Sequence, residues 1–191
     1  MRKALSEREQ EAIKAKLIDS CRICWERYGY KKTGVAELAS MSGISTGAFY
    51  SFFPSKELLF IETANAFIKK LYELMAECKP KEPTKFDFAT GFKRCIDEMF
   101  KNKWVFSLRE DSETFMRKLP EDFLQQDFQQ DLLDITIIVN QYELTPKVTI
   151  EEIVAVFHTL LMSIYLTDII GKTHKQALNL LIDASIVSLF E

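Results

Sequence analysis

The chain has 191 residues, of which 47% are hydrophobic and 28% charged, with 6 Gly and 5 Pro. This composition excludes a disordered chain, a collagen, a low-complexity linker and a disulfide scaffold, because enough apolar side chains are present to build a core. Residues 1–60 carry ten Lys and Arg against seven Asp and Glu, whereas the remaining residues carry 15 against 21. A basic N-terminal part before an acidic remainder is one hint of a nucleic-acid partner.

The N-terminal residues and the cysteines bear on location and chemistry. Residues 1–10 lack the apolar stretch of a secretory signal, and no apolar run approaches the roughly 20 residues that cross a bilayer. We therefore expect a cytoplasmic protein with no membrane partner.

Cys21 and Cys24 form a C-x-x-C pair in a helical pattern, without a second pair or a nearby His. This favours buried free thiols over metal or redox chemistry, so the sequence predicts no metal site and no cofactor.

The first predicted element is a helix over residues 9–28. Its apolar positions recur every three or four residues, so one face has to be buried. Gly29 is suited to end this helix, because glycine readily takes the positive φ of a C′ position. Further on, Pro54 breaks the chain and Ser55 can cap a new helix. The next three helices are expected over 35–40, 45–53 and about 56–75.

The rest of the chain also has helical periodicity. Pro80 and Pro83 mark a boundary between helices. The strand-like signal is confined to the β-branched run 135–139, which is predicted to be helical because polar helix formers flank it and no turn signal is present. The sequence therefore predicts an all-α fold. Further helices are expected over about 86–101, 103–117, 121–142, 149–170 and 174–190.

Residues 29–59 have the physical pattern of a helix-turn-helix. Ala39 is small where two helices have to cross closely, and Gly43 follows where the turn needs positive φ. Ile44 and Phe49 supply apolar side chains between the helices. A glycine-centred helix pair alone is a weak signal, because many all-α proteins that never touch DNA contain one.

The helix predicted over 45–53 has one face suited to a DNA major groove. Phe49 and Phe53 lie one turn apart and are expected to point inward, which leaves the opposite face outward. On that face Thr46 and Ser51 can reach base edges, while Gly47 keeps the helix slim. Tyr50 has a hydroxyl suited to a phosphate oxygen, Ser45 can cap the helix, and Lys56 adds a cation near a helix start.

The complete run resembles the N-terminal domain of the TetR family of transcriptional regulators over about residues 13–60. The resemblance implies that the third helix reads an operator in double-stranded DNA, with Tyr50 and Lys56 in phosphate-contacting places. It also puts Thr33 at the entrance of the second helix, where this chain has Gly34 in place of a second common hydroxyl. The matching elements are Gly29-Tyr30, Thr33, Leu38-Ala39, Gly43-Ile44-Ser45, Gly47, Phe49-Tyr50, Phe53 and Ser55-Lys56-Glu57-Leu58. The predicted DNA-binding residues are Thr33, Ser45, Thr46, Gly47, Tyr50, Ser51 and Lys56.

The resemblance also implies two domains, a DNA-binding domain over 1–55 and a helical effector-binding and dimerisation domain over 56–191. The sequence does not contradict this division, because the helices expected over 149–170 and 174–190 are apolar around more than one face. Such helices need burial on two sides. A homodimer through these two C-terminal helices would supply it, and its twofold symmetry matches a palindromic operator.

The middle of the chain is rich in aromatic and Met side chains. These can line a pocket for a small, largely apolar effector, although aromatic residues at helical spacing more often form core. His158 can bond a ligand, and the alternative is a satisfied core or interface histidine. The candidate effector-binding residues are Phe92, Met99, Trp104, Phe115, Phe128, His158 and Met162.

No enzyme motif stands out in the sequence. A Gly-x-Ser-x-Gly, a phosphate loop and a dinucleotide fingerprint are all missing, and neither His belongs to a Glu-x-x-His pair. We therefore expect a non-enzymatic protein, and the resemblance implies a ligand-responsive regulator, a repressor released from its operator by the effector. A helical protein-interaction module and a corepressor-dependent regulator remain alternatives.

The N-terminal arm carries the positive side chains of Arg2, Lys3 and Arg8. This arm either touches DNA or, as favoured here, is an ordinary solvated terminus.

Overall fold

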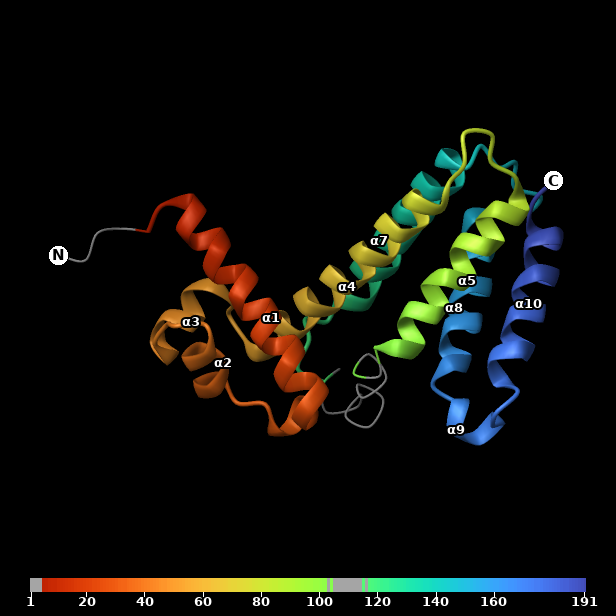
Figure 1. The fold of residues 1–191 in the computed structure, drawn as a ribbon. Coiled ribbons are helices and arrows are strands. Elements are labelled where there is room, and N and C mark those ends of the chain that lie inside the picture. The colour runs from red at the N-terminus through yellow and green to blue at the C-terminus, as the bar shows by residue number, and fades with distance from the viewer. Residues whose placement is uncertain (1–4, 103, 105–114, 116) are drawn as a thin grey trace. The chain divides into compact units, whose positions relative to one another are not determined.

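The computed structural model describes residues 5–102, 104, 115 and 117–191. Within these residues the chain is helical, apart from turns and an isolated antiparallel bridge between Pro146 and Phe190. The predicted all-α fold is confirmed, and the run 135–139 is helical as expected. The described helices are α1 (Glu7–Lys32), α2 (Val35–Met41), α3 (Thr46–Phe52), α4 (Lys56–Cys78), α5 (Lys85–Lys101), α7 (Phe123–Gln141), α8 (Ile150–Ile164), α9 (Thr167–Ile170) and α10 (His174–Leu189) (Figure 1).

The described residues pack as two compact units. Unit 1 comprises Met1–Lys69 and Lys103–Leu119, and unit 2 comprises Lys70–Asn102 and Pro120–Glu191. The division by packing therefore falls inside α4 rather than at its start. Most of the helix predicted over 103–117 lies outside the described residues, as do Arg2 and Lys3 of the N-terminal arm.

The first half of α4 belongs to unit 1 because its apolar side chains complete the core below the helix-turn-helix. Leu59 and Phe60 are fully buried. The Phe60 ring lies 4.6 Å from Trp25 of α1 and 5.2 Å from Tyr30, measured between ring centroids. The start of α4 thus packs with the N-terminal helices, and the functional boundary between residues 55 and 56 stays a prediction.

Capping and glycine conformation set the ends of the helices in unit 1. Ser6 and Glu9 form a capping box at the start of α1, in which the Ser6 N–H donates to the Glu9 carboxylate at 2.8 Å. The predicted interruption at Gly29 is confirmed by its φ of 74°, which breaks the helical geometry although hydrogen bonding continues to Lys32. At the start of α4, the Leu58 N–H donates to the Ser55 hydroxyl at 3.2 Å, as expected of an N-cap.

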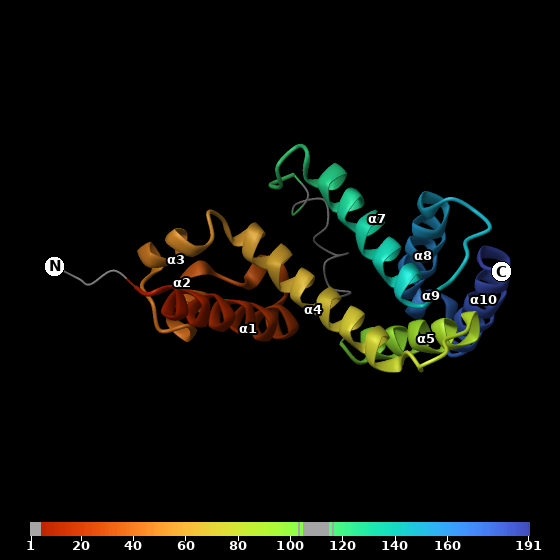
Figure 2. The same ribbon diagram turned by 90° about the horizontal axis from the view of Figure 1, so that it is seen from above.

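Unit 2 is a helical assembly in which α5, α8 and α10 lie side by side (Figures 1 and 2). Phe88 of α5 is buried between Phe157 of α8 and Phe190. Tyr142, which follows α7, donates its hydroxyl to the Met75 carbonyl at 2.6 Å. Gly91 permits this close approach, because a Cβ there would meet the Met75 sulfur at 3.0 Å and the Tyr142 hydroxyl at 3.1 Å.

The helix expected over 149–170 is interrupted, which corrects the sequence prediction. α8 ends at Ile164 and α9 starts at Thr167. Side-chain hydroxyls on both sides of the break bond the buried His174 of α10. Its Nδ1 lies 3.0 Å from Thr167 Oγ1, and its Nε2 lies 3.3 Å from Ser163 Oγ. Residues on both sides of the interruption are thus bonded to a helix that comes later in the chain. The periodicity of the sequence does not indicate such contacts.

Candidate nucleic-acid interface

The helix α3 presents the outer face that its sequence predicts. Phe49 is fully buried and Phe53 is 8% exposed, so the inner side of the helix is held by the core. Ser45 caps the helix by accepting the Ala48 N–H at 3.1 Å. Tyr50 is 53% exposed, with its ring edge against Phe49. The remaining residues of the outer face, Ser45, Thr46, Gly47 and Ser51, are all exposed.

The turn before α3 is built as the glycine pattern predicts. Gly43 has a φ of 74°, which favours glycine over residues with a side chain. Ala39 is buried, and its carbonyl accepts the Ile44 N–H at 3.0 Å. The Ser42 hydroxyl donates to the Ser20 hydroxyl of α1 at 3.2 Å in a buried pair. This pair, which sequence reasoning missed, attaches the turn to α1.

Thr33 does not lie on the outer surface, which corrects its predicted place among the DNA-contacting side chains. The residue is 1% exposed, and its hydroxyl donates to the Gly29 carbonyl at 2.8 Å. The hydroxyl is thus used to close the chain reversal that follows α1. Gly34 forms the N-cap of α2 without a side-chain hydrogen bond. The hydroxyl that the resemblance expects at this position is therefore not replaced by another capping side chain.

Lys56 also differs from the expectation of a cation directed at a phosphate. Its ammonium donates to the Tyr30 carbonyl at 2.9 Å and to the Thr33 carbonyl at 3.0 Å. The same nitrogen lies 4.1 Å from the centroid of the Tyr30 ring. Lys56 therefore joins the start of α4 to the end of α1 and to Thr33, which follows α1. Lys31 and Lys32, which the sequence did not single out, are exposed cations in the last turn of α1.

Glu57 holds a buried carboxylate beside this lysine. The residue is 7% exposed, and its Oε1 accepts hydrogen bonds from the Tyr30 hydroxyl and from Lys118 Nζ, the latter at 3.3 Å. Burial opposes ionisation of Glu57, but the Tyr30 and Lys118 hydrogen bonds outweigh it, so the pKa of Glu57 lies below its ordinary value. The sequence marks Tyr30 and Glu57 only as motif positions and gives no sign of Lys118.

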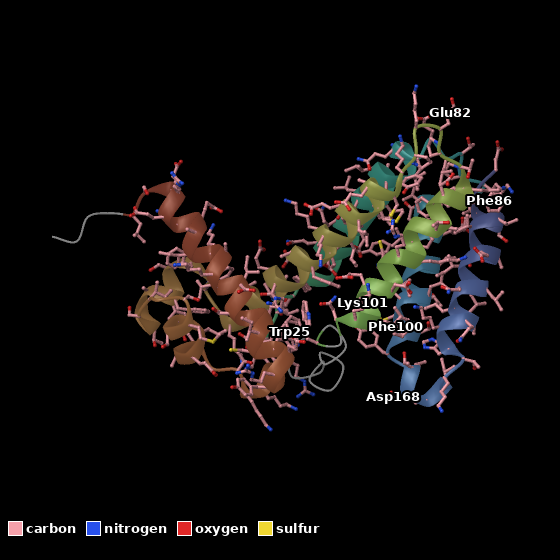
Figure 3. All side chains as sticks on the ribbon, in the orientation of Figure 1. Trp25, Glu82, Phe86, Phe100, Lys101 and Asp168 are labelled. Atoms are coloured by element: carbon pink, nitrogen blue, oxygen red, sulfur yellow. The ribbon has the colours of Figure 1, made fainter. Side chains whose placement is uncertain are left out.

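The seven candidate effector residues do not gather in one unit. Trp104 lies in unit 1, with ring centroids 4.9 Å from Trp25 and 5.4 Å from Phe67. Phe115 also lies in unit 1, 5.2 Å from the Tyr30 ring. Figure 3 labels Trp25 on α1, the helix against which Trp104 packs. These contacts make Trp104 and Phe115 part of the unit 1 core that supports the helix-turn-helix.

The other five candidates lie in unit 2 in different surroundings. Phe92 and Met99 are buried in α5, and the Phe92 ring lies 4.7 Å from that of Phe157. Phe128 and Met162 are exposed at 37% and 56%. His158 is half-buried, with its Nε2 2.9 Å from Asp131 Oδ2. The structure thus gives His158 the protein partner that the alternative interpretation expected.

The cysteines behave as packing residues. Cys21, Cys24 and Cys95 are buried, Cys78 is half-buried, and none of the four forms a disulfide. Burial raises the pKa of the Cys21 thiol to about 12 and that of Cys95 to about 12, which keeps both protonated and unreactive. In the part of the chain that the structure describes, His, Cys, Asp and Glu side chains nowhere gather in threes that could hold a metal ion.

The C-terminal helices carry apolar side chains on two faces, as predicted. α8 and α10 bury Phe157 and Ile182 within unit 2. The opposite faces remain open, with Leu180 71%, Leu181 55% and Val187 47% exposed along α10. Leu180 and Val187 lie seven residues apart and so on one side of the helix, and Leu181 lies about 100° around the axis from Leu180. Among the described residues, no helix has the length and apolar character needed to cross a bilayer.

Comparison with known sequences relates the same region to one family. Residues 17–63 match bacterial regulatory proteins of the tetR family. An uncharacterized HTH-type transcriptional regulator of Bacillus subtilis, YuxN, is 29% identical over 86 residues, which are 45% of this chain and 28% of that protein. The HTH-type transcriptional repressor AcnR of Corynebacterium jeikeium is 34% identical over 64 residues, which are 34% of each chain. The matches therefore span about a third or less of these relatives' own length.

Solved structures resemble nearly the whole chain. A putative TetR-family transcriptional regulator from Mesorhizobium loti has a TM-score of 0.61 at 17% identity, covering 94% of this chain and 95% of that one. RolR in complex with resorcinol gives 0.61 at 19%, covering 94% and 90%. The SmeT–triclosan complex gives 0.59 at 12%, covering 94% and 92%. At these identities the likeness establishes a shared fold.

Proposed function

Because the chain belongs to the TetR family of bacterial regulatory proteins, through its N-terminal domain and its fold, we propose that it binds an operator in double-stranded DNA and represses transcription. The outward face of α3 carries this proposal. Thr46 and Ser51 offer hydroxyls at its surface, and Gly47 is exposed between them. Because Gly47 has no side chain, the backbone of α3 can approach a major groove closely.

The phosphate contacts are proposed to come from residues of α3 and from residues before α2. Tyr50 is the exposed hydroxyl of α3, and Lys31 and Lys32 are the exposed cations ahead of α2. Lys56 supports binding from within, because its ammonium is already bonded to the Tyr30 and Thr33 carbonyls. The affinity that such contacts provide decreases as the salt concentration rises, because each phosphate neutralised by the protein releases counterions.

The active form in this proposal is a homodimer through α8 and α10. The open apolar faces of these helices need a partner, and a second copy offers the same face. A twofold dimer presents two α3 helices to successive major grooves, about 34 to 36 Å apart for half-sites one helical turn apart. This symmetry requires a palindromic operator.

A small, largely apolar effector is proposed to release the operator. The related folds of RolR and SmeT hold resorcinol and triclosan, both aromatic molecules. Within unit 2 the candidates are Phe92, Met99, Phe128, His158 and Met162. To move the dimer from 1:99 to 99:1 in favour of a non-binding conformation, the effector has to prefer that conformation by about 5.5 kcal/mol.

The experiment that tests the proposal starts from a pool of random duplexes. We expect the purified chain to select a palindromic sequence and to bind it with an affinity that falls steeply between about 50 and 200 mM salt. A helical protein-interaction module is the competing function, and it would show no such binding. Binding that appears only when a small molecule is added would identify a corepressor-dependent regulator instead. Thermal-shift screening of aromatic compounds followed by operator release would then identify the effector.

A further inference from the structure

The carboxylate of Glu57 joins two separate stretches of unit 1. Tyr30, at the end of α1, donates its hydroxyl to Glu57 Oε1, and Lys118 donates to the same oxygen at 3.3 Å. A buried carboxylate has to be neutralised or hydrogen-bonded, since an unpaired buried charge is costly. Lys118 is the cation that meets this need, and it belongs to the stretch Lys103–Leu119 rather than to the N-terminal residues.

Lys56, the residue before Glu57, connects the start of α4 to the segment that leads into the helix-turn-helix. The Lys56 ammonium bonds the Tyr30 and Thr33 carbonyls, and Thr33 directly precedes the N-cap of α2. The start of α4 thus fixes the end of α1 through Glu57 and the start of α2 through Lys56. α2 in turn leads into α3 through the turn at Gly43, so the start of α4 is connected to the helix-turn-helix.

Aromatic packing adds a second contact between the same two stretches. The Phe115 ring meets the Tyr30 ring edge to face at 5.2 Å, and Lys118 Nζ lies 5.7 Å from the centroid of that ring. Tyr30 itself is 1% exposed. The position of Tyr30 therefore depends on residues 115 and 118 as well as on α4. The Lys118 side chain is 53% exposed, so it can be substituted without opening a core cavity.

We propose that Lys118 is a positioning residue for DNA recognition. Through Glu57 and Tyr30 it holds the junction of α1, α2 and α4 in the arrangement that presents α3, without contacting DNA itself. The inference rests on the proposed DNA-binding function and adds to it a residue distant in sequence from the helix-turn-helix. Anything that displaces Phe115 or Lys118 would then alter operator binding without touching α3.

The test compares Lys118→Met with Lys118→Arg and with a control lysine. Lys101 also makes an exposed ion pair, 3.6 Å from Glu98, but lies in unit 2. We expect Lys118→Met to weaken binding to the selected operator by about tenfold, because the buried Glu57 carboxylate loses a charged partner. Its salt slope and its affinity for a random duplex should equal those of the wild type, Lys118→Arg should restore operator affinity, and Lys101→Met should leave it unchanged.

Three outcomes would overturn the proposal. Unchanged operator affinity in Lys118→Met means that the residue positions nothing. A salt slope lower by about one identifies Lys118 as a direct phosphate contact. Equal losses for operator and random duplex, together with a lowered melting temperature, indicate general unfolding. If the wild type binds no duplex in a salt-dependent way, the proposed function itself fails, and Lys101→Met will show the same absence.

A double-mutant cycle with Glu57→Gln and a hydrogen-exchange measurement make the proposal testable even if one variant folds poorly. Since Lys118 is proposed to act through Glu57, adding Lys118→Met to Glu57→Gln should cause no further loss of operator affinity. Backbone amides of residues 34–53 should exchange faster in Lys118→Met than in Lys101→Met. Additive losses, or equal exchange in the two variants, would contradict action through Glu57.

Discussion

Trp25 and Trp104, the two tryptophans of the chain, pack edge to face with ring centroids 4.9 Å apart although 79 positions separate them. Both are buried within unit 1. Phe60 and Phe67 of α4 also contact this pair, with ring centroids 4.6 Å from Trp25 and 5.4 Å from Trp104 respectively. The aromatic core of unit 1, which packs against α1 and α4, therefore includes Trp104 from the stretch Lys103–Leu119.

Replacement of Trp104 tests the energetic weight of this core. Trp104→Ala should lower the free energy of unfolding by about 3 to 5 kcal/mol, because it removes a buried aromatic ring and leaves a cavity. Urea unfolding followed by Trp25 fluorescence measures the change. Phe86→Ala is the matched control, since Phe86 is 61% exposed and its loss should cost little. Equal effects of the two substitutions would show that Trp104 is not part of the stable core.

Thr46 tests which residues read the DNA sequence. Thr46→Ala should change the preferred operator by about 1 to 3 kcal/mol at each affected base pair, because the hydroxyl that reaches the base edge is lost. Repeating the duplex selection with the variant measures this change. Ser40→Ala serves as the control, since Ser40 is exposed on α2 outside the predicted face. A uniform loss across all operators would instead assign Thr46 to the phosphate backbone.

Lys56 distinguishes internal support from a phosphate contact. Lys56→Met should lower the free energy of unfolding by about 1 to 3 kcal/mol, because two carbonyls lose a charged donor. Denaturant unfolding measures this loss, with Lys14→Met as a control whose partner Glu11 lies 3.7 Å away in an exposed pair. Unchanged stability combined with a salt slope reduced by about one would show that Lys56 leaves the carbonyls to contact DNA.

Leu180 tests the proposed dimer face. Leu180→Asp places a charge on the open side of α10 and should weaken dimerisation by about 2 kcal/mol or more, if this position lies in the centre of the interface. Sedimentation velocity across a concentration series measures the shift toward monomer. Leu133→Asp is the control, because Leu133 is 59% exposed on α7, a helix that is not part of the proposed interface. A dimer that survives Leu180→Asp would move the interface elsewhere.

The His158–Asp131 pair should make stability depend on pH. The Asp131 hydrogen bond raises the pKa of His158 above its ordinary value of 6.5, with support from the charge of Asp127 and against partial burial. Because the folded-state pKa is the higher one, the pair stabilises fully below about pH 6.5 and loses its effect as pH rises through the folded value. Melting temperatures between pH 5.5 and about pH 8.5 should fall less in His158→Gln than in the wild type. Parallel curves would show that the pair contributes nothing.

The helix-turn-helix was predictable because its determinants lie close together in the chain. Gly43 supplies the positive φ, Ser45 caps α3 three residues before its bond partner, and Phe49 and Phe53 bury one side. Each of these features depends on neighbours within one or two helical turns. The exposure of Thr46 and Tyr50 follows from the same spacing, so the outward face of α3 needed no knowledge of the rest of the fold.

The partners of long or polar side chains were decided only by the tertiary structure. Lys56 and Thr33 were expected at the surface, yet the reversal after α1 gives both of them backbone carbonyls to bond. Trp104 was expected in an effector pocket, but α1 and α4 supply its aromatic neighbours. Sequence spacing fixes which side of a helix a residue occupies, whereas the group it meets there comes from distant segments that only the folded chain brings within reach.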